Sequence, residues 1–438
     1  MNRRLMLACT VLISVLLSAC APSSLTTASA PQDNPALSFV VMGDNRPADP
    51  FHPEQPYIYH KIVRTAVSLK PELILNTGDL VVGYDATSPE RASREFDDFE
   101  RATKPIRDHD IPLYITMGNH SGYTPFARAE FSRRYRDKAS GRLYYSIDRG
   151  NCHFIVLSSE LEGEQAQISG AQLAWLKNDL EGAAGKHIFI LLHRPLYPKI
   201  KHLDNCLNAH PEERDQLAQL LKQHQVEMVF VGHVHVYNYS VIDGLGQITA
   251  GGSGAPLSGT LAEGGFNHFF QVIVRGDDID YRLLPVTNET LLATDLLERG
   301  YPEGALAMAE IAMETVPGHP QPYIIAALSH AVAAQEQQAA AMAGRLEEIF
   351  GNRDQTLFRL GEYALSVRQL ELADRYLSQS MERDRNSFAT VYHYGQLKQL
   401  QKQYPRALMA YDRALALTEN PHYRSDINNK IREIKTEL

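Results

Sequence analysis

The chain lacks an excess of positive charge. Its 438 residues include 43 Lys and Arg against 52 Asp and Glu, which gives a formal net charge of −9 at pH 7. Nucleic acids and anionic lipid surfaces attract basic proteins, so no nucleic-acid surface binding is expected. After the first twenty residues, no apolar run is long enough to span a bilayer. The composition therefore indicates an acidic, water-exposed protein body.

Cysteine is also scarce, with four in the whole chain. Cys9 and Cys20 lie near the amino terminus, which leaves Cys152 and Cys206 for the body of the protein. Cys152 stands in the apolar run CHFIVL, which is typical of a buried strand. A disulfide between the two is an alternative, because pairing does not follow from sequence separation.

The amino terminus has the pattern of an export signal. Met1 to Arg4 is positively charged, and Leu5 to Leu17 is apolar but too short to cross a membrane. The following Leu-Ser-Ala-Cys20 resembles the lipobox of bacterial lipoproteins. That resemblance implies cleavage before Cys20 and lipidation of Cys20, whereas an ordinary signal peptide with a stray Cys is the alternative. Residues 21–36 are rich in Ser, Thr, Ala and Pro and are expected to form a flexible tether.

The same resemblance predicts where the protein acts. A lipidated Cys20 would place it in the cell envelope, held to the membrane by the lipid anchor only. Ala21 follows the Cys where an Asp would favour retention at the inner membrane. In a Gram-negative host this predicts the periplasmic face of the outer membrane, and in a Gram-positive host the outer face of the cell membrane.

Five polar clusters are the most informative feature present, and each follows a short apolar run. The runs are SFVVM, ELILNT, PLYITM, HIFILL and VEMVFV, and each is typical of a buried strand. The clusters that follow them are Gly43-Asp44-Asn45-Arg46, Gly78-Asp79, Gly118-Asn119-His120, His193 and Gly232-His233-Val234-His235. Ligands bind at the carboxyl edge of open α/β sheets, so these side chains should converge there. Asp, Asn and His together suit a pair of divalent metal ions.

In this order the clusters resemble the motifs of the calcineurin-like metallophosphoesterase family, over residues 37–286. The resemblance implies an α/β four-layer sandwich, with two mixed β-sheets flanked by helices. Helical patterns separate the expected strands in agreement with it, at about 56–69, 89–103, 124–136, 170–181 and 211–224. It also implies a metallophosphoesterase that hydrolyses a phosphomonoester or phosphodiester by attack of metal-bound hydroxide.

The resemblance carries over to individual residues. It implies that Asp79 bridges two divalent metal ions (Mn, Fe or Zn). Asp44 and His235 would ligate the first metal, and Asn119, His193 and His233 the second. His120 would bind the phosphate or protonate the leaving group, which suits a side chain whose usual pKa is near neutrality. Asn119 would also lie beside the substrate.

Arg46 departs from the family pattern, which has a His ligand at that position. Arginine carries no lone pair for a metal, so the first metal would lose one ligand. Three nearby residues are candidate substitutes, namely His52, Tyr57 and His60. Arg46 could instead bind the substrate phosphate through two hydrogen bonds, or pair with a nearby acid.

Three further departures from the family pattern narrow the choice of subfamily. Ser121 stands where many relatives have an acid that orients the catalytic His. Val82 occupies the place of the ligand Tyr of purple acid phosphatases, and Tyr84 is two residues further on. The serine/threonine phosphatase motif is absent after Asp79. The Gly-rich segment 251–256 follows the last His motif and is expected either to line the substrate cleft or to form a plain turn.

The last third of the chain has a different pattern. Small residues recur every 34 positions, at Ala305, Ala339, Ala373 and Ala407. This spacing resembles tetratricopeptide repeats, which are helix-turn-helix units that stack into a solenoid. The resemblance predicts an all-α solenoid over residues 289–438, and a plain helical bundle is the alternative. Such repeats would bind a protein or peptide partner or pack against the catalytic domain.

Two functions of different classes follow from the sequence. The first is an active metallophosphoesterase on a cell-envelope lipoprotein. The second is a binding or scaffold lipoprotein whose phosphoesterase domain is degenerate. Arg46 keeps the second open, whereas the first is favoured by the retention of seven motif residues: Asp44, Asp79, Asn119, His120, His193, His233 and His235.

Overall fold

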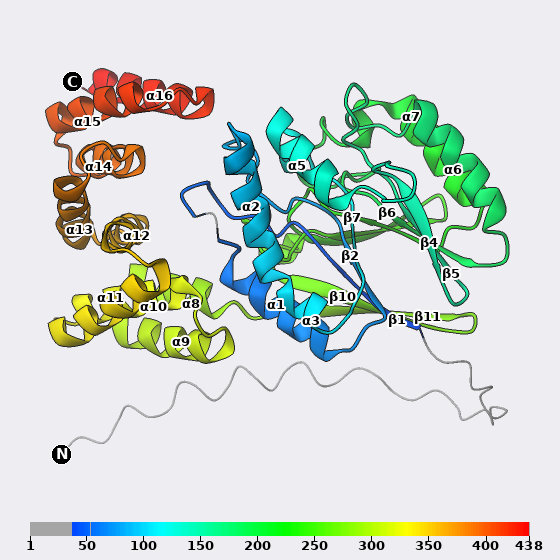
Figure 1. Cartoon of the computed structure of the whole chain (residues 1–438), viewed down its shortest axis with the longest axis horizontal. Coiled ribbons are helices and arrows are strands. Elements are labelled where there is room, and N and C mark those ends of the chain that lie inside the picture. Colours follow the sequence, from blue (N-terminus) through cyan, green and yellow to red (C-terminus); the bar gives the residue numbers. More distant parts are fainter. Residues whose placement is uncertain (1–36, 53, 438) are drawn as a thin grey trace, which may run out of the picture.

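The computed structural model describes residues 37–52 and 54–437. The expected lipidation site Cys20 and the tether 21–36 lie outside the described residues. Figure 1 shows an α/β part formed by the first two thirds of the chain and a curved array of helices formed by the last third. No described helix is long and apolar enough to cross a membrane.

The α/β part contains two mixed sheets. The first has the order β11-β10-β1-β2-β3, in which β1 is parallel to β2 and antiparallel to β10. Its strands are β1 (Leu37–Met42), β2 (Leu73–Asn76), β3 (Leu113–Ile115), β10 (His268–Arg275) and β11 (Asp278–Pro285). The second sheet has the order β4-β5-β6-β7-β9-β8. Its strands are β4 (Tyr145–Arg149), β5 (Cys152–Val156), β6 (His187–Leu191), β7 (Met228–Val231), β8 (Tyr237–Ile242) and β9 (Leu245–Ala250).

The two sheets pack face to face. Side chains alternate along β1, so Phe39 and Val41 enter the core between the sheets while Val40 and Met42 face the helices outside. Phe39 meets Phe154 and Phe189 of the second sheet edge-on, with ring centroids 4.9 and 5.1 Å apart. Both faces of each sheet are therefore apolar, as the uninterrupted hydrophobic runs in the sequence predict.

Helices cover the outer faces. The first sheet carries α1 (Tyr57–Ser68), α2 (Pro89–Ala102), α3 (Lys104–Asp108) and α5 (Pro125–Tyr135), and the short α4 (Asn119–Gly122) follows β3. The second sheet carries α6 (Gly170–Gly182) and α7 (Pro211–Gln223). This arrangement confirms the predicted α/β four-layer sandwich, and the five expected helical stretches form helices.

The last third of the chain is entirely helical, as predicted. Its elements are α8 (Glu289–Glu298), α9 (Pro302–Thr315), α10 (Pro320–Val332), α11 (Glu336–Phe350), α12 (Arg353–Ser366), α13 (Leu370–Arg383), α14 (Phe388–Leu400), α15 (Tyr404–Leu417) and α16 (Pro421–Glu437). The starts of α9, α11, α13 and α15 are each 34 residues apart. We call residues 289–437 the helical region.

Small residues let these helices approach closely. Ala305, Ala373 and Ala407 are completely buried. A Cβ at Gly361 would lie 2.9 Å from the backbone nitrogen of Leu377, and the 34-residue spacing brings the equivalent Gly395 equally close to Tyr411. The period seen in the sequence is therefore a period of helix contacts.

The helical region shares a core with the sandwich. Ala312 of α9 and Val316, which directly follows α9, belong to the same apolar cluster as the inner face of α1. At the same junction, the hydroxyl of Tyr57 donates to a carboxylate oxygen of Glu289 at 2.9 Å, and Lys61 forms an ion pair with the other oxygen. The two parts are thus joined by buried contacts as well as by the chain.

The two cysteines of the body do not pair. Cys152 lies in β5 and Cys206 in the loop before α7, and both are buried free thiols. Burial raises the pKa of each thiol to about 12. Cys152 is therefore an apolar strand residue, as the run around it predicts.

Candidate metal centre

The polar clusters lie where strands end. Asp44 follows β1, Asp79 follows β2 and Asn119 begins α4 just after β3. From the second sheet, His193 follows β6, while His233 and His235 follow β7. The structure brings all six predicted metal ligands to one edge of the sandwich, and all six are buried.

Glycines allow this convergence. A Cβ at Gly118 would lie 2.2 Å from Oδ1 of Asp79, and one at Gly232 would lie 2.2 Å from Oδ2 of Asp44. Asp44, Asp79 and His233 themselves have positive φ angles of 53°, 54° and 68°, which side chains other than Gly adopt rarely. Such backbone conformations often mark functional sites, because the surrounding structure must compensate their cost.

One group of possible metal ligands consists of Asp44, Asp79 and His235. One ligand atom from each lies within 4.8 Å of the others. The Nδ1 of His235 donates to the carbonyl oxygen of Pro256 at 2.6 Å, which leaves the lone pair of Nε2 facing Oδ1 of Asp44 at 3.6 Å. Two carboxylates and an imidazole lone pair pointing into one space suit a divalent cation.

A second group surrounds the amide oxygen of Asn119. Nε2 of His193 lies 2.9 Å from this oxygen and Nδ1 of His233 lies 2.7 Å from it. The other nitrogen of each ring faces an oxygen acceptor elsewhere: Thr77 O at 2.8 Å for His193 and Asn205 Oδ1 at 3.1 Å for His233. The ring protons are therefore held on the outer nitrogens, and lone pairs meet around Asn119.

Asp79 connects the two groups. Its Oδ1 lies 3.5 Å from Nε2 of His193, and the same residue belongs to the group with Asp44 and His235. Lone pairs and carboxylates that face one another repel unless a cation lies between them. The donor set thus fits two divalent cations that share Asp79.

The electrostatics of the site agree with this. Burial raises the pKa of Asp44 well above its usual value, and the charge of Asp79 raises it further. Burial acts in the same direction on Asp79, but the neighbouring His193 and His120 bring its pKa below the usual value. Burial also lowers the pKa of His235 to about 4 and that of His233 well below its usual value, so both rings are neutral and can ligate.

His120 lies beside the two groups. Its backbone N–H donates to Oδ1 of Asp79 at 3.0 Å, and its Nε2 is 4.0 Å from Oδ2. Its Nδ1 donates to the carbonyl oxygen of Val82 at 2.7 Å. A backbone carbonyl therefore orients the ring, the task an acid performs in many relatives, while the buried Ser121 hydroxyl has no hydrogen-bond partner among the described residues. Burial lowers the pKa of His120 to about 4.

Arg46 extends into the electrostatic field of the site. Its backbone N–H donates to the carbonyl oxygen of Asp79 at 3.0 Å, and its Nη1 donates to the carbonyl oxygen of Pro47 at 3.0 Å. Its positive charge acts on Asp44, Asp79 and His235. Within the described residues no acid lies at ion-pair distance from Arg46, and its buried Nε has no partner.

The three candidate substitutes for the missing His ligand lie elsewhere. Nε2 of His52 is 2.8 Å from Glu362 of α12, and Tyr57 bonds Glu289 of α8. The His60 ring packs against His319 at a centroid distance of 5.2 Å. All three contact the helical region, and the structure assigns none of them to the metal groups.

Sequence reasoning missed three residues at the site. Asn205 contacts His233, and the ring of His202 lies 4.5 Å from that of His233. The hydroxyl of Tyr123 accepts a hydrogen bond from the side chain of Asn119 at 2.9 Å. His202 and Asn205 lie in the irregular segment between β6 and α7, where no motif or periodicity marks them.

The segment 251–256 packs against the site. Ser253 N–H donates to the carbonyl oxygen of Gly43 at 3.1 Å, and Ala255 N–H donates to that of Asp44 at 2.8 Å. Pro256 at the end of the same segment orients His235. The segment therefore supports the first ligand group and is not a plain turn.

Comparison with known proteins agrees with this geometry. Residues 37–237 match the model of the calcineurin-like phosphoesterase family. These residues form a calcineurin-like metallophosphoesterase domain. The match implies a dinuclear centre of divalent metal ions in the phosphoesterase domain, and the group of Asp44, Asp79 and His235 is a candidate for part of its ligands.

Relatives of the phosphoesterase domain include purple acid phosphatases. Purple acid phosphatase 23 of Arabidopsis thaliana is 29% identical over 203 residues, which cover 38% of this chain and 41% of the relative. The tartrate-resistant acid phosphatase type 5 of Sus scrofa is 25% identical over 54% of this chain and 75% of the relative. A purple acid phosphatase structure from yellow lupin (Lupinus luteus) seeds is 17% identical, with a TM-score of 0.46, over 58% of this chain and 52% of that one. The chain thus spans about two fifths of the length of the Arabidopsis relative.

Proposed function

We propose that this protein is a metal-dependent phosphoesterase that hydrolyses a phosphomonoester or phosphodiester. The observation that carries the proposal is the pair of ligand groups that share Asp79 at one sheet edge. Similarity to purple acid phosphatases and to a probable cyclic nucleotide phosphodiesterase of Rhodococcus erythropolis, 25% identical over 41% of this chain and 56% of the relative, supports both substrate classes.

The residues divide into ligands and substrate-handling groups. Asp44, Asp79 and His235 would hold one cation, and Asp79, Asn119, His193 and His233 the other. When bound, such a pair of cations supplies a water of lowered pKa as nucleophile and neutralises charge on the phosphoryl oxygens. The neutral imidazoles of His233 and His235 are in the protonation state that ligation needs. Burial favours the protonated form of Asp44, and the charge of a bound cation would favour its carboxylate instead.

Arg46 and His120 would handle the substrate. The guanidinium of Arg46 is a fixed positive charge with an unpartnered buried N–H, which suits a phosphate oxygen. The Nε2 of His120 faces the site because Nδ1 donates to Val82 O. Nε2 would bind the phosphate or give a proton to the leaving group only in the protonated ring, and the negative charge of a bound phosphate would favour that form. Asn119, whose amide oxygen is at the centre of the second ligand group, would also lie beside the substrate.

The test is hydrolysis by the protein without residues 1–20. We expect turnover of aryl phosphate or bis-aryl phosphate after loading with Mn, Fe or Zn, and loss of that turnover in a chelator. Two equivalents of bound metal should accompany activity. Protein that holds no metal and hydrolyses neither substrate would contradict the proposal and support the degenerate scaffold instead.

Arg46 has its own test. Arg46→Ala should lower kcat/KM by about ten- to a hundredfold, because a charge-assisted hydrogen bond is worth roughly 1.5–3 kcal/mol. Metal content should not change. Arg282→Ala is the matched control, because Arg282 is exposed and pairs with Asp280. This variant should change kcat/KM by less than about threefold.

We further propose a lipid-anchored location and a tetratricopeptide-like helical region. The lipobox-like Leu17 to Cys20 supports the anchor, and the helix starts spaced 34 residues apart support the repeats. Cys20→Ala should move the full chain from the membrane fraction to the soluble fraction, since a protein without its acyl chains has no other proposed anchor. Retention of this variant in washed membranes would refute the lipid anchor as the sole attachment.

A further inference from the structure

We propose that the helical region positions the two substrate-handling residues, Arg46 and His120, through contacts that hold the loops next to them. This inference rests on the proposed function and concerns the regulation of the same site. The metal ligands, in contrast, are held by the sandwich itself. The helical region would thus set catalytic efficiency without setting metal content.

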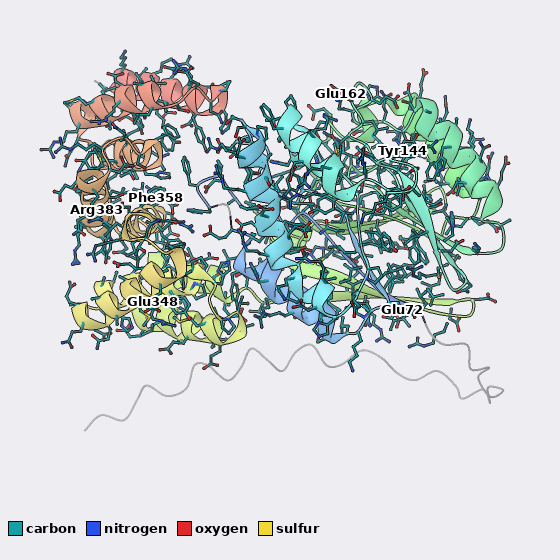
Figure 2. The ribbon with its side chains drawn as sticks, in the orientation of Figure 1. Glu72, Tyr144, Glu162, Glu348, Phe358 and Arg383 are labelled. Atoms are coloured by element: carbon teal, nitrogen blue, oxygen red, sulfur yellow. The ribbon has the colours of Figure 1, made fainter. Side chains whose placement is uncertain are left out.

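The first contact between the helical region and a loop is an aromatic pocket around Phe51. Phe51 belongs to the loop after Arg46, and it inserts among rings of the helical region. Its ring lies 4.9 Å from that of His393 and 5.3 Å from that of Tyr423. Three further rings complete the pocket at 6.0–6.3 Å: Phe358 from α12 (Figure 2), Phe388 and Tyr392. Figure 1 shows that the concave side of the curved helical array faces the sandwich.

Ion pairs flank the inserted ring. His52 lies 2.8 Å from Glu362, and Glu54 lies 2.5 Å from the guanidinium of Arg359. Glu362 is 11% exposed and Arg359 only 4%. Each of these buried charges needs its partner from the loop, because an unpaired buried charge is strongly destabilising. The loop is therefore the natural occupant of this surface.

The loop transmits its position to Arg46 over a short distance. Pro47 and Pro50 fix two of the backbone angles between Arg46 and Phe51. Oδ1 of Asp49 accepts a hydrogen bond from the N–H of Phe51 at 2.8 Å, which closes a turn. At the other end, Arg46 N–H bonds Asp79 O, so the segment is fixed at both ends.

The helical region makes a second contact, with the loop that orients His120. Asn420, just before α16, donates through its side-chain amide to Oδ1 of Asp85 at 3.0 Å. The ring of His422 lies 4.8 Å from that of Tyr84. This loop begins with Val82, whose carbonyl oxygen fixes the ring of His120. Both non-ligand groups of the site are thus adjacent to loops that the helical region holds.

The metal ligands have supports of a different origin. His193, His233 and His235 are oriented by Thr77, Asn205 and Pro256, all of which belong to the part of the chain before residue 286. Loosening the helical contacts should therefore leave metal content unchanged and impair substrate handling. That pattern separates a positioning role from a general loss of structure.

The decisive experiment is a double-mutant cycle in the metal-loaded chain lacking residues 1–20. Phe51→Ala should lower kcat/KM by about tenfold with two metal equivalents retained, since misplacing a catalytic group is costly. In an Arg46→Ala background the same change should have less than about a twofold effect, because Phe51 acts through Arg46. Phe51→Tyr, which keeps the ring, should restore most of the activity.

Leu180→Ala is the matched control, because Leu180 is completely buried in α6 and belongs to an apolar cluster that contains no residue of either loop. It should lower the melting temperature without changing kcat/KM. A milder second arm is Asn420→Ala, whose effect on kcat/KM should disappear in a His120→Ala background. Fully additive effects in both cycles, or metal loss in Phe51→Ala, would overturn the inference. Absence of activity in the unmutated protein would instead refute the proposed function.

Discussion

At the scale of single residues, Asp79 has the most demanding position. It contacts both ligand groups, and its buried carboxylate keeps a low pKa only because positive or polar groups surround it. Asp79→Asn removes the charge that both cations would share. We expect kcat to fall roughly a thousandfold, which corresponds to about 4 kcal/mol of transition-state stabilisation.

The measurement for Asp79 combines turnover with metal analysis. Asp215→Asn is the control, because Asp215 is an exposed residue of α7 whose side chain pairs with Arg214. Bound metal should fall below one equivalent in Asp79→Asn and stay at two in the control. Two tightly held equivalents in Asp79→Asn would show that Asp79 is no bridge.

Some features of the site could be predicted from the sequence residue by residue, and others could not. The six ligand candidates could be predicted because each follows a Gly or an apolar strand at a fixed distance. The orientation of His120 could not, since it depends on a backbone carbonyl at Val82, and carbonyls are present at every position. Nor could Asn205, because only the tertiary fold brings its loop to His233.

At the scale of secondary-structure elements, α2 supports the loop that contains Val82. Glu95 of α2 accepts a hydrogen bond from Gly83 N–H at 2.9 Å. Burial raises the pKa of Glu95 to about 7, above its usual 4.5. The folded state therefore favours the protonated form, and stability from this group is full below pH 4.5 and is lost as the pH rises to 7.

Glu95→Gln should remove that pH dependence. The amide keeps an acceptor for Gly83, so we expect the variant to be more stable than the unmutated chain at pH 8, by about 1–3 kcal/mol. The difference should vanish at pH 4. Urea titrations at both pH values measure it, and equal stability of the two proteins at pH 8 would contradict the prediction.

The helical region offers a second test at this scale. Gly361→Ala would drive a Cβ against the backbone of Leu377, so we expect a loss of about 1–3 kcal/mol. Gly344→Ala is the matched control, since a Cβ there meets nothing within 4 Å in the middle of α11. It should stabilise the protein by about 0.5–1 kcal/mol, because Ala suits a helix interior better. Thermal unfolding of the two variants gives the comparison.

Elements were largely predictable from the sequence for physical reasons. Long helices have an apolar period. In addition, α2 and α5 begin after Ser88 and Thr124, and each of these side chains accepts a hydrogen bond from the N–H of the third helical residue. The short α4 has no such signal, and its helix of NHSG is set by its contacts at the site. The 34-residue period was visible because only small residues fit where helices cross.

At the scale of the whole molecule, the two parts depend on each other. A chain that ends at Val286 would lose Glu289, the partner of Tyr57 and Lys61, and would expose the apolar face of α1 that packs on Ala312 and Val316. We expect such a chain to be much less soluble and to unfold at a temperature several degrees lower. Expression yield and calorimetry measure this, with the chain lacking only residues 1–36 as control.

The sequence offered packing of the repeats against the catalytic domain as one of two alternatives, but it did not show which residues make the contact. The sequence shows where a strand pattern ends and a helical pattern begins near residue 288. It shows nothing of Phe51, a lone aromatic in a loop, whose five ring partners are separated from it by more than 300 residues. If the truncated chain kept the full stability of the control, the boundary near residue 288 would be only a linker between two independent parts.

The position of Tyr423 in the Phe51 pocket also has a consequence for biosynthesis. A ribosome makes Arg46 early, but the rings that receive its loop emerge from residue 358 onward, and the last of them is Tyr423. The first strand waits as well, since β1 pairs with β10 at residues 268–275. The nascent chain can thus collect its metal ligands long before its substrate loop is set. Under the proposed positioning role, full catalytic efficiency would come last, after residue 423 has been made.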